Sequence, residues 1–326
     1  MKTISEKKRR HLESLSNEHG VIAALAIDQR GSIMKMMGKY KSGLANEKAI
    51  EEFKCLVSEK LTPYASSILL DPEYGLPASK VRHEKAGLIL AYEKTGYDAN
   101  QVGRLPDLLE NWSAGRLARE GADAIKILLY YDVDEGEEIN DIKHAFVERV
   151  GDECRALEIP YFLEIVSYDA KIEDVKSKEY AKIKPHKVIE AMKVFSQEHY
   201  RVDVLKVEVP VNMDYVEGYG QDVLHSKHEA LAYFKQQSEA TRLPFIFLSA
   251  GVSAELFRKT LYFAKEAGST FNGVLCGRAT WKDGVEPYTK GVEEANGWLE
   301  EQGRENMEEL NAALNDTATS WKERLS

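Results

Sequence analysis

The sequence predicts an α/β fold: a closed (β/α)8 barrel, or TIM barrel, with extra helices at both ends of the chain. Eight short apolar runs recur along the 326 residues. They are near-continuous rather than alternating, which is typical of parallel strands covered on both faces. Helical stretches separate them, and eight such units fill about 250 residues, the usual size of this barrel. The rival, an open doubly wound sheet, favours G-x-G-x-x-G after its first strand, which Asp28-Gln29-Arg30-Gly31 does not match.

The first half of the chain supplies four of the predicted strands. A polar helix is ended by Gly20, and Phe53, Val57 and Leu61 are spaced along one helical face. A short connector with Pro77 joins the second and third strands. The predicted strands are Val21–Asp28, Ser66–Pro72, Gly87–Glu93 and Asp123–Asp132, and the predicted helices are Glu6–His19, Asn46–Leu61, Leu105–Glu120 and Ile139–Leu157.

The second half continues the same alternation. The predicted strands are Pro160–Asp169, Val202–Pro210, Pro244–Val252 and Gly273–Trp281, and the predicted helices are Pro185–Tyr200, Ser226–Thr241, Ala254–Gly268, Gly291–Gly303 and Asn306–Leu325. No low-complexity linker interrupts them, so we expect one domain over residues 1–326.

Composition excludes several classes of protein. The net charge is −10, and no basic stripe with interleaved aromatic residues is present, so we expect no nucleic-acid partner. Three cysteines without a C-x-x-C pattern indicate free thiols in a reducing compartment. No segment approaches the roughly 20 apolar residues of a membrane span, and residues 1–10 are too polar for a secretory signal. We therefore expect a cytoplasmic protein with no membrane partner.

Lys206 is the first candidate for chemistry. It stands in the middle of the β-branched run Val202–Pro210, V-D-V-L-K-V-E-V-P. Lysine is rarely buried unless it is paired or functional. Removal from water favours its neutral amine, which attacks carbonyl carbons. The alternative is a lysine whose stem packs while its ammonium reaches solvent, and this strand alone leaves both interpretations open.

Other strands also carry polar residues late in their apolar runs, and the active site of such a barrel lies at the carboxyl ends of the strands. With Lys206, six strands contribute Asp28, Lys126, Glu164, Glu208, Ser249 and Arg278. Buried charges are costly unless paired, so packing alone explains the set poorly. Lys206 would form a Schiff base with a ketone, and Glu164 would shuttle protons. Lys126 would be a second cation that favours the neutral Lys206 amine, and Asp28 would orient Lys126 or a substrate hydroxyl. Spacing alone does not decide which lysine is the nucleophile.

The last two strands indicate a phosphate site. Ser249-Ala250-Gly251-Val252-Ser253 leads into a helix, and Gly277-Arg278 ends the eighth strand. Loops after strands 7 and 8, with a helix N-terminus, form the usual phosphate site of these barrels. Small residues admit the phosphate to backbone N–H groups, and Ser249 and Arg278 add a hydroxyl and a forked cation.

No metal site is expected. None of the eight histidines falls in a predicted strand, and His225 and His228, although tolerably spaced, lie in a polar stretch predicted to be exposed. A rival enzyme hypothesis uses Asp132, Glu164 and Asp169 as metal ligands, with a lysine as base that enolises the substrate.

Several long motifs identify a family resemblance. They are L-T-P-Y-A-S-S-I-L-L-D-P-E-Y-G-L (61–76), L-A-Y-E-K-T-G-Y-D (90–98), G-A-D-A-I-K (121–126), L-L-Y-Y-D-V-D (128–134), D-V-L-K-V-E-V-P-V-N-M (203–213), L-S-A-G-V-S (248–253) and G-V-L-C-G-R-A-T-W (273–281). Over essentially the whole chain, the sequence closely resembles the tagatose 1,6-bisphosphate aldolases, class I enzymes of bacterial lactose and galactose use.

The resemblance implies a metal-independent lyase without a cofactor. It would split D-tagatose 1,6-bisphosphate, and also its stereoisomer fructose 1,6-bisphosphate, through a Schiff base on Lys206, with Glu164 as acid/base. The remaining residues that match the family's site are the supporting Asp28, Gln29 and Lys126, and the phosphate ligands Ser249, Gly251, Gly277 and Arg278. The expected partners are this ketose bisphosphate and further copies of the chain, as a dimer or tetramer. The alternative function is a sugar-phosphate-sensing regulatory protein that retains the aldolase site.

Overall fold

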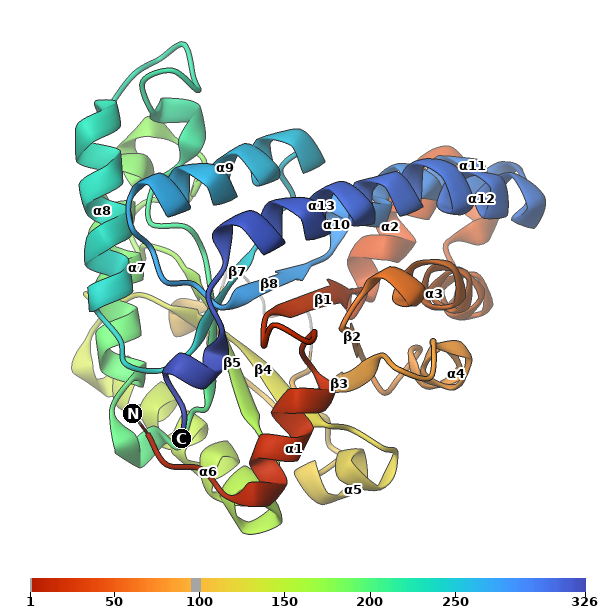
Figure 1. The fold of residues 1–326 in the computed structure, drawn as a ribbon, viewed down its shortest axis with the longest axis horizontal. Helices are drawn as coiled ribbons and strands as arrows, with labels where there is room; N and C mark the ends of the chain where they lie inside the picture. Colours follow the sequence, from red (N-terminus) through yellow and green to blue (C-terminus); the bar gives the residue numbers. More distant parts are fainter. Residues whose placement is uncertain (1, 95–100) are drawn as a thin grey trace.

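The computed structural model describes residues 2–94 and 101–326, so the end of the 90–98 motif lies outside the described residues. Eight parallel strands close into a barrel in the order β1-β2-β3-β4-β5-β6-β7-β8, which confirms the predicted TIM barrel (Figure 1). The strands are β1 Ile22–Ala26, β2 Ser67–Leu70, β3 Gly87–Ala91, β4 Ala124–Tyr131, β5 Tyr161–Ser167, β6 Val204–Val207, β7 Phe245–Leu248 and β8 Gly273–Cys276.

Helices follow the strands and surround the barrel, and further helices occur at both chain ends (Figure 1). They are α1 Glu6–Ser14, α2 Gly31–Tyr40, α3 Glu47–Leu61, α4 Leu76–Val81, α5 Ala114–Arg119, α6 Glu137–Leu157, α7 Lys178–Phe195, α8 Lys227–Glu239, α9 Ala254–Glu266, α10 Arg278–Trp281, α11 Val285–Lys290, α12 Val292–Trp298 and α13 Arg304–Thr317.

Alternate strand residues point into the barrel, and near the strand starts they are apolar. This inner core includes Ala24, Ala26, Leu69, Ile89, Ala91, Ala124, Phe162, Val204, Ile246 and Leu275. The intervening strand residues pack in a second, larger core with the surrounding helices. Because successive strand side chains alternate, Lys126, Glu164 and Lys206, each two residues after an inner apolar residue, also face inward. The alternation of strand side chains therefore places these three charged residues directly above the apolar inner core.

The two chain ends close the opposite mouth of the barrel. Leu12 of α1 and Trp321 belong to the inner core. Lys2 pairs with Leu325 in a short parallel bridge, and the termini lie near each other in Figure 1. Lys8 of α1 forms an ion pair with the fully buried Asp203 at the start of β6. The inward-facing charges therefore lie on the other side of the inner core, at the carboxyl ends of the strands.

The sequence interpretation missed four helices, α2, α4, α10 and α11, and the signals of the first two are weak. α2 begins after Arg30 without a side-chain cap, contains two glycines and buries only Ile33 and Met37. α4 was assigned to a connector on account of Pro77, but a proline fits the first turn of a helix, where its missing N–H removes no helical hydrogen bond.

Several predicted boundaries were wrong. The Pro185–Tyr200 helix begins earlier, because Ser177 accepts a hydrogen bond from the backbone N–H of Tyr180, and Pro185 lies inside α7. The Leu105–Glu120 helix is reduced to α5, whose cap is Ser113. The two C-terminal helices join through a π-helical turn at Leu299–Gly303, and α13 ends at Thr317 instead of reaching Leu325. The eighth strand ends at Cys276, and Arg278 begins α10.

The structure describes all three cysteines and the length and polarity of the helices. Cys55, Cys154 and Cys276 are all unpaired. In the described part of the chain, every helix is too short or too polar to cross a bilayer.

Candidate active site

Five charged side chains from five strands or strand ends meet above the inner core. Lys126 Nζ lies 2.8 Å from Asp28 Oδ2, 2.8 Å from Glu93 Oε1 and 2.7 Å from Glu164 Oε2. The other oxygen of Glu164, Oε1, lies 2.7 Å from Lys206 Nζ. Glu164 therefore bridges the two lysines, and the predicted quartet of Asp28, Lys126, Glu164 and Lys206 is gathered in one place.

The strand register explains this convergence. Glu164 of β5 is directly opposite Lys206 of β6, and both side chains point inward. Lys126 of β4 is in register with Ala91, the last residue of β3, so it lies close to Glu93 two residues further on. Asp28 follows β1 by two residues, on the same inward side as Ala26. Neighbouring strands thus supply the contacts of Lys126 with Glu93 and Glu164 and of Glu164 with Lys206, whereas the contact between Asp28 and Lys126 crosses the barrel from β1 to β4.

The two lysines are in different electrostatic surroundings. Burial acts to lower the pKa of Lys126, but the charges of Asp28, Glu164 and Glu93 outweigh it and raise the pKa well above its ordinary value. Lys126 therefore stays an ammonium, with a carboxylate within reach of each of its three hydrogens. Lys206 has one carboxylate partner among the described residues, Glu164. The two lysines are linked through Glu164, because each forms an ion pair with a different oxygen of its carboxylate.

The three acids around Lys126 also differ from one another in the direction of their pKa shifts. Burial acts to raise the pKa of Asp28 and that of Glu164, but the charges of Lys126 and Lys206 hold both pKa values below their ordinary range. Glu164 therefore rests as a carboxylate, a base ready to accept a proton. Burial raises the pKa of Glu93, and Lys126 only partly opposes it.

Glu93 was missed by the sequence interpretation. It follows the apolar strand β3 in G-L-I-L-A-Y-E, the same pattern that marked Asp28 after β1. An acid at the end of an inward-facing strand was therefore the available signal. The side chain is 1% exposed, and its Oε1 completes the set of carboxylates around Lys126.

A cavity of about 930 Å³ opens over this cluster and extends to the loops after β7 and β8. Gly251 has φ +78°, in the left-handed region, and a Cβ there would lie 3.1 Å from Arg278 Cζ. Glycine thus permits both the turn and the close approach of the guanidinium. The predicted phosphate residues Gly251 and Arg278 are brought together.

Gln29 and Gly277 form the other side of this part of the cavity. A Cβ on Gly277 would lie 3.0 Å from Ala26 O and 3.3 Å from Gln29 Nε2, so β1 and β8 close tightly there. Gln29 Oε1 is buried and has no hydrogen-bond partner among the described residues. Ser249 also lines the cavity and lies against Cys276, where burial raises the thiol pKa to about 12 and the Ser249 hydrogen bond opposes the rise.

Glu208 directly follows β6 and lies two residues after Lys206. Its Oε2 accepts hydrogen bonds from Ser167 N at 2.7 Å and Ser167 Oγ at 2.6 Å. Its Oε1 lies 3.3 Å from Lys184 Nζ on α7. Glu208 and Lys184 line the cavity wall above β5 and β6, the strands that carry Glu164 and Lys206. Glu208 is thus part of the upper wall and has no contact with the Lys126 cluster in the described structure.

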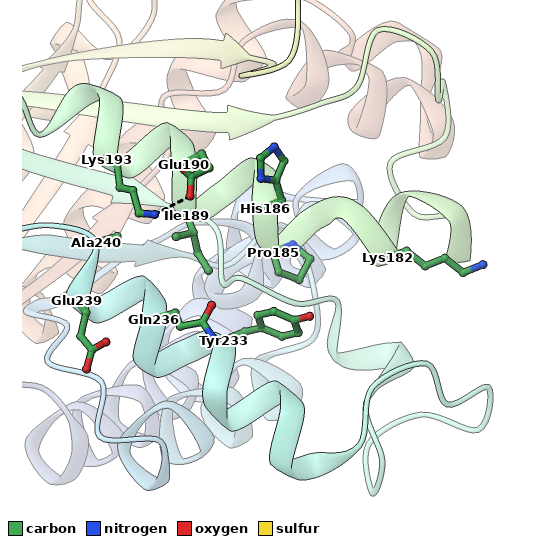
Figure 2. A pocket seen from close by; sticks show the side chains of 10 residues that line it. All are labelled: Lys182, Pro185, His186, Ile189, Glu190, Lys193, Tyr233, Gln236, Glu239 and Ala240. Atoms are coloured by element: carbon green, nitrogen blue, oxygen red, sulfur yellow. Dashed lines mark hydrogen bonds and ion pairs between the residues drawn. The ribbon is translucent and has the colours of Figure 1, made fainter.

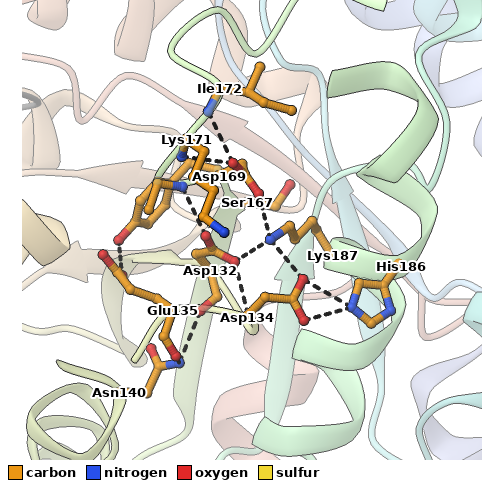
Figure 3. Close-up of polar contacts among 12 residues, drawn as sticks. Asp132, Asp134, Glu135, Asn140, Ser167, Asp169, Lys171, Ile172, His186 and Lys187 are labelled. Carbon is orange, nitrogen blue, oxygen red and sulfur yellow. Dashed lines mark hydrogen bonds and ion pairs between the residues drawn. The ribbon is translucent and has the colours of Figure 1, made fainter. Parts of the chain in front are cut away.

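The rival metal ligands do not come together with Glu164. Lys187 of α7 binds Asp132, and lies 2.8 Å from both Asp134 Oδ2 and Asp169 Oδ2 (Figure 3). Asp132 and Asp169 are thereby occupied by a lysine, whereas Glu164 bridges the other two. Among the described residues, no group of three or more His, Cys, Asp or Glu side chains has the geometry of a metal site.

Two further features lie outside the cavity. His225 is 7% exposed, and one ring nitrogen lies 3.3 Å from Ala181 O, so its predicted exposure was wrong. The tertiary contact with α7, which sequence pattern does not reveal, buries it. A shallow hollow of about 420 Å³ lies between α7 and α8, where Lys193 and Glu190 form an ion pair at 2.6 Å (Figure 2). No strand residue lines that hollow.

Comparison with known proteins shows the family of this chain. Residues 22–283 match the DeoC/LacD family aldolase. The chain belongs to the DeoC/LacD aldolase family. Full-length relatives of this aldolase include tagatose 1,6-diphosphate aldolase 1 of Enterococcus faecalis, 64% identical with 100% of both chains covered. Tagatose 1,6-diphosphate aldolase of Streptococcus agalactiae is 60% identical, covering 98% of this chain and 99% of that one.

Solved structures share the fold of this aldolase. Fructose-bisphosphate aldolase from Plasmodium falciparum superimposes with a TM-score of 0.67 at 16% identity, covering 98% of each chain. At this identity the likeness shows the barrel fold alone.

Proposed function

We propose that this chain is a class I aldolase that cleaves D-tagatose 1,6-bisphosphate into glycerone phosphate and D-glyceraldehyde 3-phosphate through a Schiff base on Lys206. The full-length relatives named tagatose 1,6-diphosphate aldolase support the substrate, and the family supports the reaction type. The role belongs to lactose and galactose breakdown. We take residues 1–326 as one aldolase domain.

The contrast between the two lysines is the observation that carries the choice of nucleophile. Lys126 is held as an ammonium by three carboxylates, and an ammonium has no lone pair with which to attack a carbonyl. Lys206 shares one carboxylate, Glu164, and lines the cavity. Transfer of one proton from Lys206 Nζ to Glu164, 2.7 Å away, leaves a free amine at a site where substrate enters.

Glu164 is the proton shuttle in the proposed cycle. The Lys206 amine attacks the ketose C2, and the carbinolamine loses its hydroxyl as water, with the proton supplied by Glu164. Glu164, again a carboxylate, removes the C4 hydroxyl proton. The C3–C4 bond then breaks, its electron pair moves toward the iminium to give an enamine, and the aldehyde departs. Protonation at C3 and addition of water release glycerone phosphate and restore Lys206.

Lys126 and Asp28 support this chemistry electrostatically. The Lys126 ammonium lies 2.7 Å from Glu164 and stabilises the carboxylate form that removes the proton. Asp28 orients Lys126 from the other side at 2.8 Å. No step of this cycle requires a metal ion or an organic cofactor.

One substrate phosphate is assigned to the loops after β7 and β8. We propose that Arg278 and Ser249 bind it with side chains, that Gly251 and Gly277 admit it to the backbone, and that Gln29 adds its amide. The closeness of Gly251 to Arg278 and of Gly277 to Gln29 supports this assignment. Fructose 1,6-bisphosphate, which carries the same phosphates, is proposed as a second substrate.

The setting of the enzyme is also a proposal. We place it in the cytoplasm, acting as a homodimer or homotetramer, and the unpaired cysteines agree with a reducing compartment. The sugar-phosphate sensor is not favoured, because the relatives that match over their full length are named as aldolases.

Direct assay of cleavage tests the proposed function. The purified chain is incubated with D-tagatose 1,6-bisphosphate, and both triose phosphates are measured by coupled enzymes, with D-fructose 1,6-bisphosphate in parallel. We expect equal amounts of the two trioses from the tagatose compound. Saturable binding of the sugar without release of trioses would support the sensor and overturn the proposal.

A further inference from the structure

Glu93 is a buried acid whose function nothing described so far assigns. We propose that Glu93 is a positioning residue: it binds one N–H of Lys126 so that the other two point at Asp28 and Glu164, which keeps Glu164 against Lys206. This inference rests on the proposed Schiff-base function of Lys206.

The contacts form a continuous path from Glu93 to the proposed nucleophile. Glu93 Oε1 is 2.8 Å from Lys126 Nζ, Lys126 Nζ is 2.7 Å from Glu164 Oε2, and Glu164 Oε1 is 2.7 Å from Lys206 Nζ. A lysine ammonium has three hydrogens, and the three carboxylates around Lys126 use all of them. Without Glu93, one hydrogen would lack a partner and the ammonium could rotate or shift away from Glu164.

The backbone around Glu93 is itself well anchored. Arg30 Nη2 donates to the carbonyl of Glu93 at 2.9 Å, and Arg30 is 4% exposed. Glu93 also pairs with Leu108 in an antiparallel bridge, and the flanking Lys94 N–H donates to Asp107 O at 2.9 Å. Glu93 is therefore fixed on both sides of the strand end, as a positioning residue requires.

Glu93 acts on Lys126 as a hydrogen-bond acceptor, through Oε1. Its Oε2 is buried and has no hydrogen-bond partner among the described residues, so the contact with Lys126 is the one that its side chain makes there. The groups that face it are Lys126, Asp28 and Arg30, and burial raises its pKa against the effect of Lys126. Glutamine has the same shape and the same acceptor, so it is the conservative replacement.

Three substitutions of Glu93 test this role, with Asp203→Asn as the matched control. Asp203 is a fully buried acid bound by Lys2 and Lys8 at the closed mouth of the barrel, far from the cavity. Glu93→Gln should keep kcat within about threefold of wild type. Glu93→Leu should lower kcat by about 10- to 100-fold with KM nearly unchanged, because a displacement of about 1 Å in a catalytic group has effects of this size. Glu93→Asp shortens the side chain by one methylene, so its kcat should lie between those of Glu93→Gln and Glu93→Leu. This variant also provides the test if Glu93→Leu does not fold.

The pH profile separates positioning from loss of stability. When Lys126 moves from Glu164, the pKa of Glu164 rises, so the acid limb of the kcat profile should move to higher pH in Glu93→Leu and Glu93→Asp. Asp203→Asn should lower the melting temperature and leave kcat and this limb unchanged. Wild-type kcat and pH profile in Glu93→Asp and in folded Glu93→Leu would overturn the inference. So would an equal loss in Glu93→Gln, or a rise in KM with kcat unchanged. Borohydride trapping of wild type with glycerone phosphate tests the underlying function separately, since a missing adduct at Lys206 would refute that function instead.

Discussion

Two buried lysines in this molecule are each surrounded by three carboxylates. Lys126 contacts Asp28, Glu93 and Glu164, and Lys187 contacts Asp132, Asp134 and Asp169. Both are at most 2% exposed. In both, burial acts to lower the pKa, and the carboxylates outweigh it and raise the pKa above its ordinary value. By the exposure of the lysine and the number of its acidic partners alone, the two sites are nearly the same.

The carboxylates around the two lysines differ in their other contacts. Glu164 turns its second oxygen to Lys206 in the cavity. The acids around Lys187 instead hold the chain after β5: Asp132 accepts from Ala170 N at 2.9 Å, and Asp169 accepts from Lys171 N at 2.8 Å and Ile172 N at 3.0 Å (Figure 3). The comparison teaches that a buried ion cluster indicates chemistry when one of its members is shared with a second reactive group, whereas ion pairs alone indicate structure.

The largest expected effect comes from removing each lysine in turn. Lys126→Met should lower kcat by about 10²- to 10⁴-fold, the range for loss of acid–base catalysis, because Glu164 loses its orienting cation. Lys187→Met should leave kcat of the folded enzyme within a few-fold of wild type. Each variant leaves buried carboxylates unpaired and should lose about 3–5 kcal/mol of stability. Steady-state kinetics measure kcat, and urea unfolding measures the stability. Equal losses of kcat in the two variants would contradict the distinction between a catalytic and a structural lysine cluster.

Arg278 tests whether the cavity over Lys126 is the place where the bisphosphate binds. Arg278→Ala removes a forked cation beside Gly251 and should cost about 1.5–3 kcal/mol of binding, by the usual worth of hydrogen bonds to charged groups. The corresponding fall in kcat/KM is about 10- to 150-fold, mainly through KM. Arg258→Ala, which breaks an ion pair with Glu309 on the outer helices, is the control and should leave kinetics unchanged. Unchanged kcat/KM in Arg278→Ala would show that the phosphate lies elsewhere.

The pH dependence of stability gives a smaller effect with a defined sign. Folding lowers the pKa of Asp28 and of Glu164, so in the folded state these acids bind fewer protons than in the unfolded state near their ordinary pKa of about 4. The two acids therefore stabilise the folded state above about pH 4, and this contribution is lost as the pH falls through their pKa values in the folded state. Lys126→Met removes the main cation, so its deficit in unfolding free energy should widen as the pH rises from about 3 to 5. Glu93 adds to the deficit, because its pKa, already raised, rises further without Lys126.

Lys187→Met should show the same sign with a smaller change. Folding also lowers the pKa of Asp134 and of Asp169, but the Asp134 side chain is 53% exposed and its interaction is screened by solvent. Urea midpoints at a series of pH values compare the two variants. A deficit in Lys126→Met that shrinks as the pH rises would contradict the described ion pairs.

No effect is expected from metal removal. Two of the rival ligands, Asp132 and Asp169, are held by Lys187, and Glu164 is held by Lys126 and Lys206. Cleavage in excess EDTA should proceed at the rate measured without it. Strong inhibition that zinc reverses would favour the metal-dependent rival.

The strand pattern predicted most of the fold, and for a physical reason. Strands buried on both faces are near-continuous apolar runs, so Lys126, Glu164 and Lys206 stood out as costly exceptions and were placed correctly on β4, β5 and β6. Asp132 and Asp169 stood out in the same way, and only tertiary contacts separate them from the cavity acids. Glu93 was overlooked because an acid after a strand is common, and its inward direction becomes decisive only when Lys126 lies in register beside it. The start of α7 was misplaced because a proline inside a helix is rare.

The identity of the amine that forms the Schiff base is the central claim, and chemical trapping tests it most directly. Wild type, Lys206→Ala and Lys126→Met are treated with glycerone phosphate and borohydride, and the modified peptide is mapped by mass spectrometry. We expect the adduct on Lys206 in wild type, a weaker adduct on Lys206 in Lys126→Met, and none in Lys206→Ala. An adduct on Lys126, or labelling that persists in Lys206→Ala, would show that the nucleophile is a different lysine.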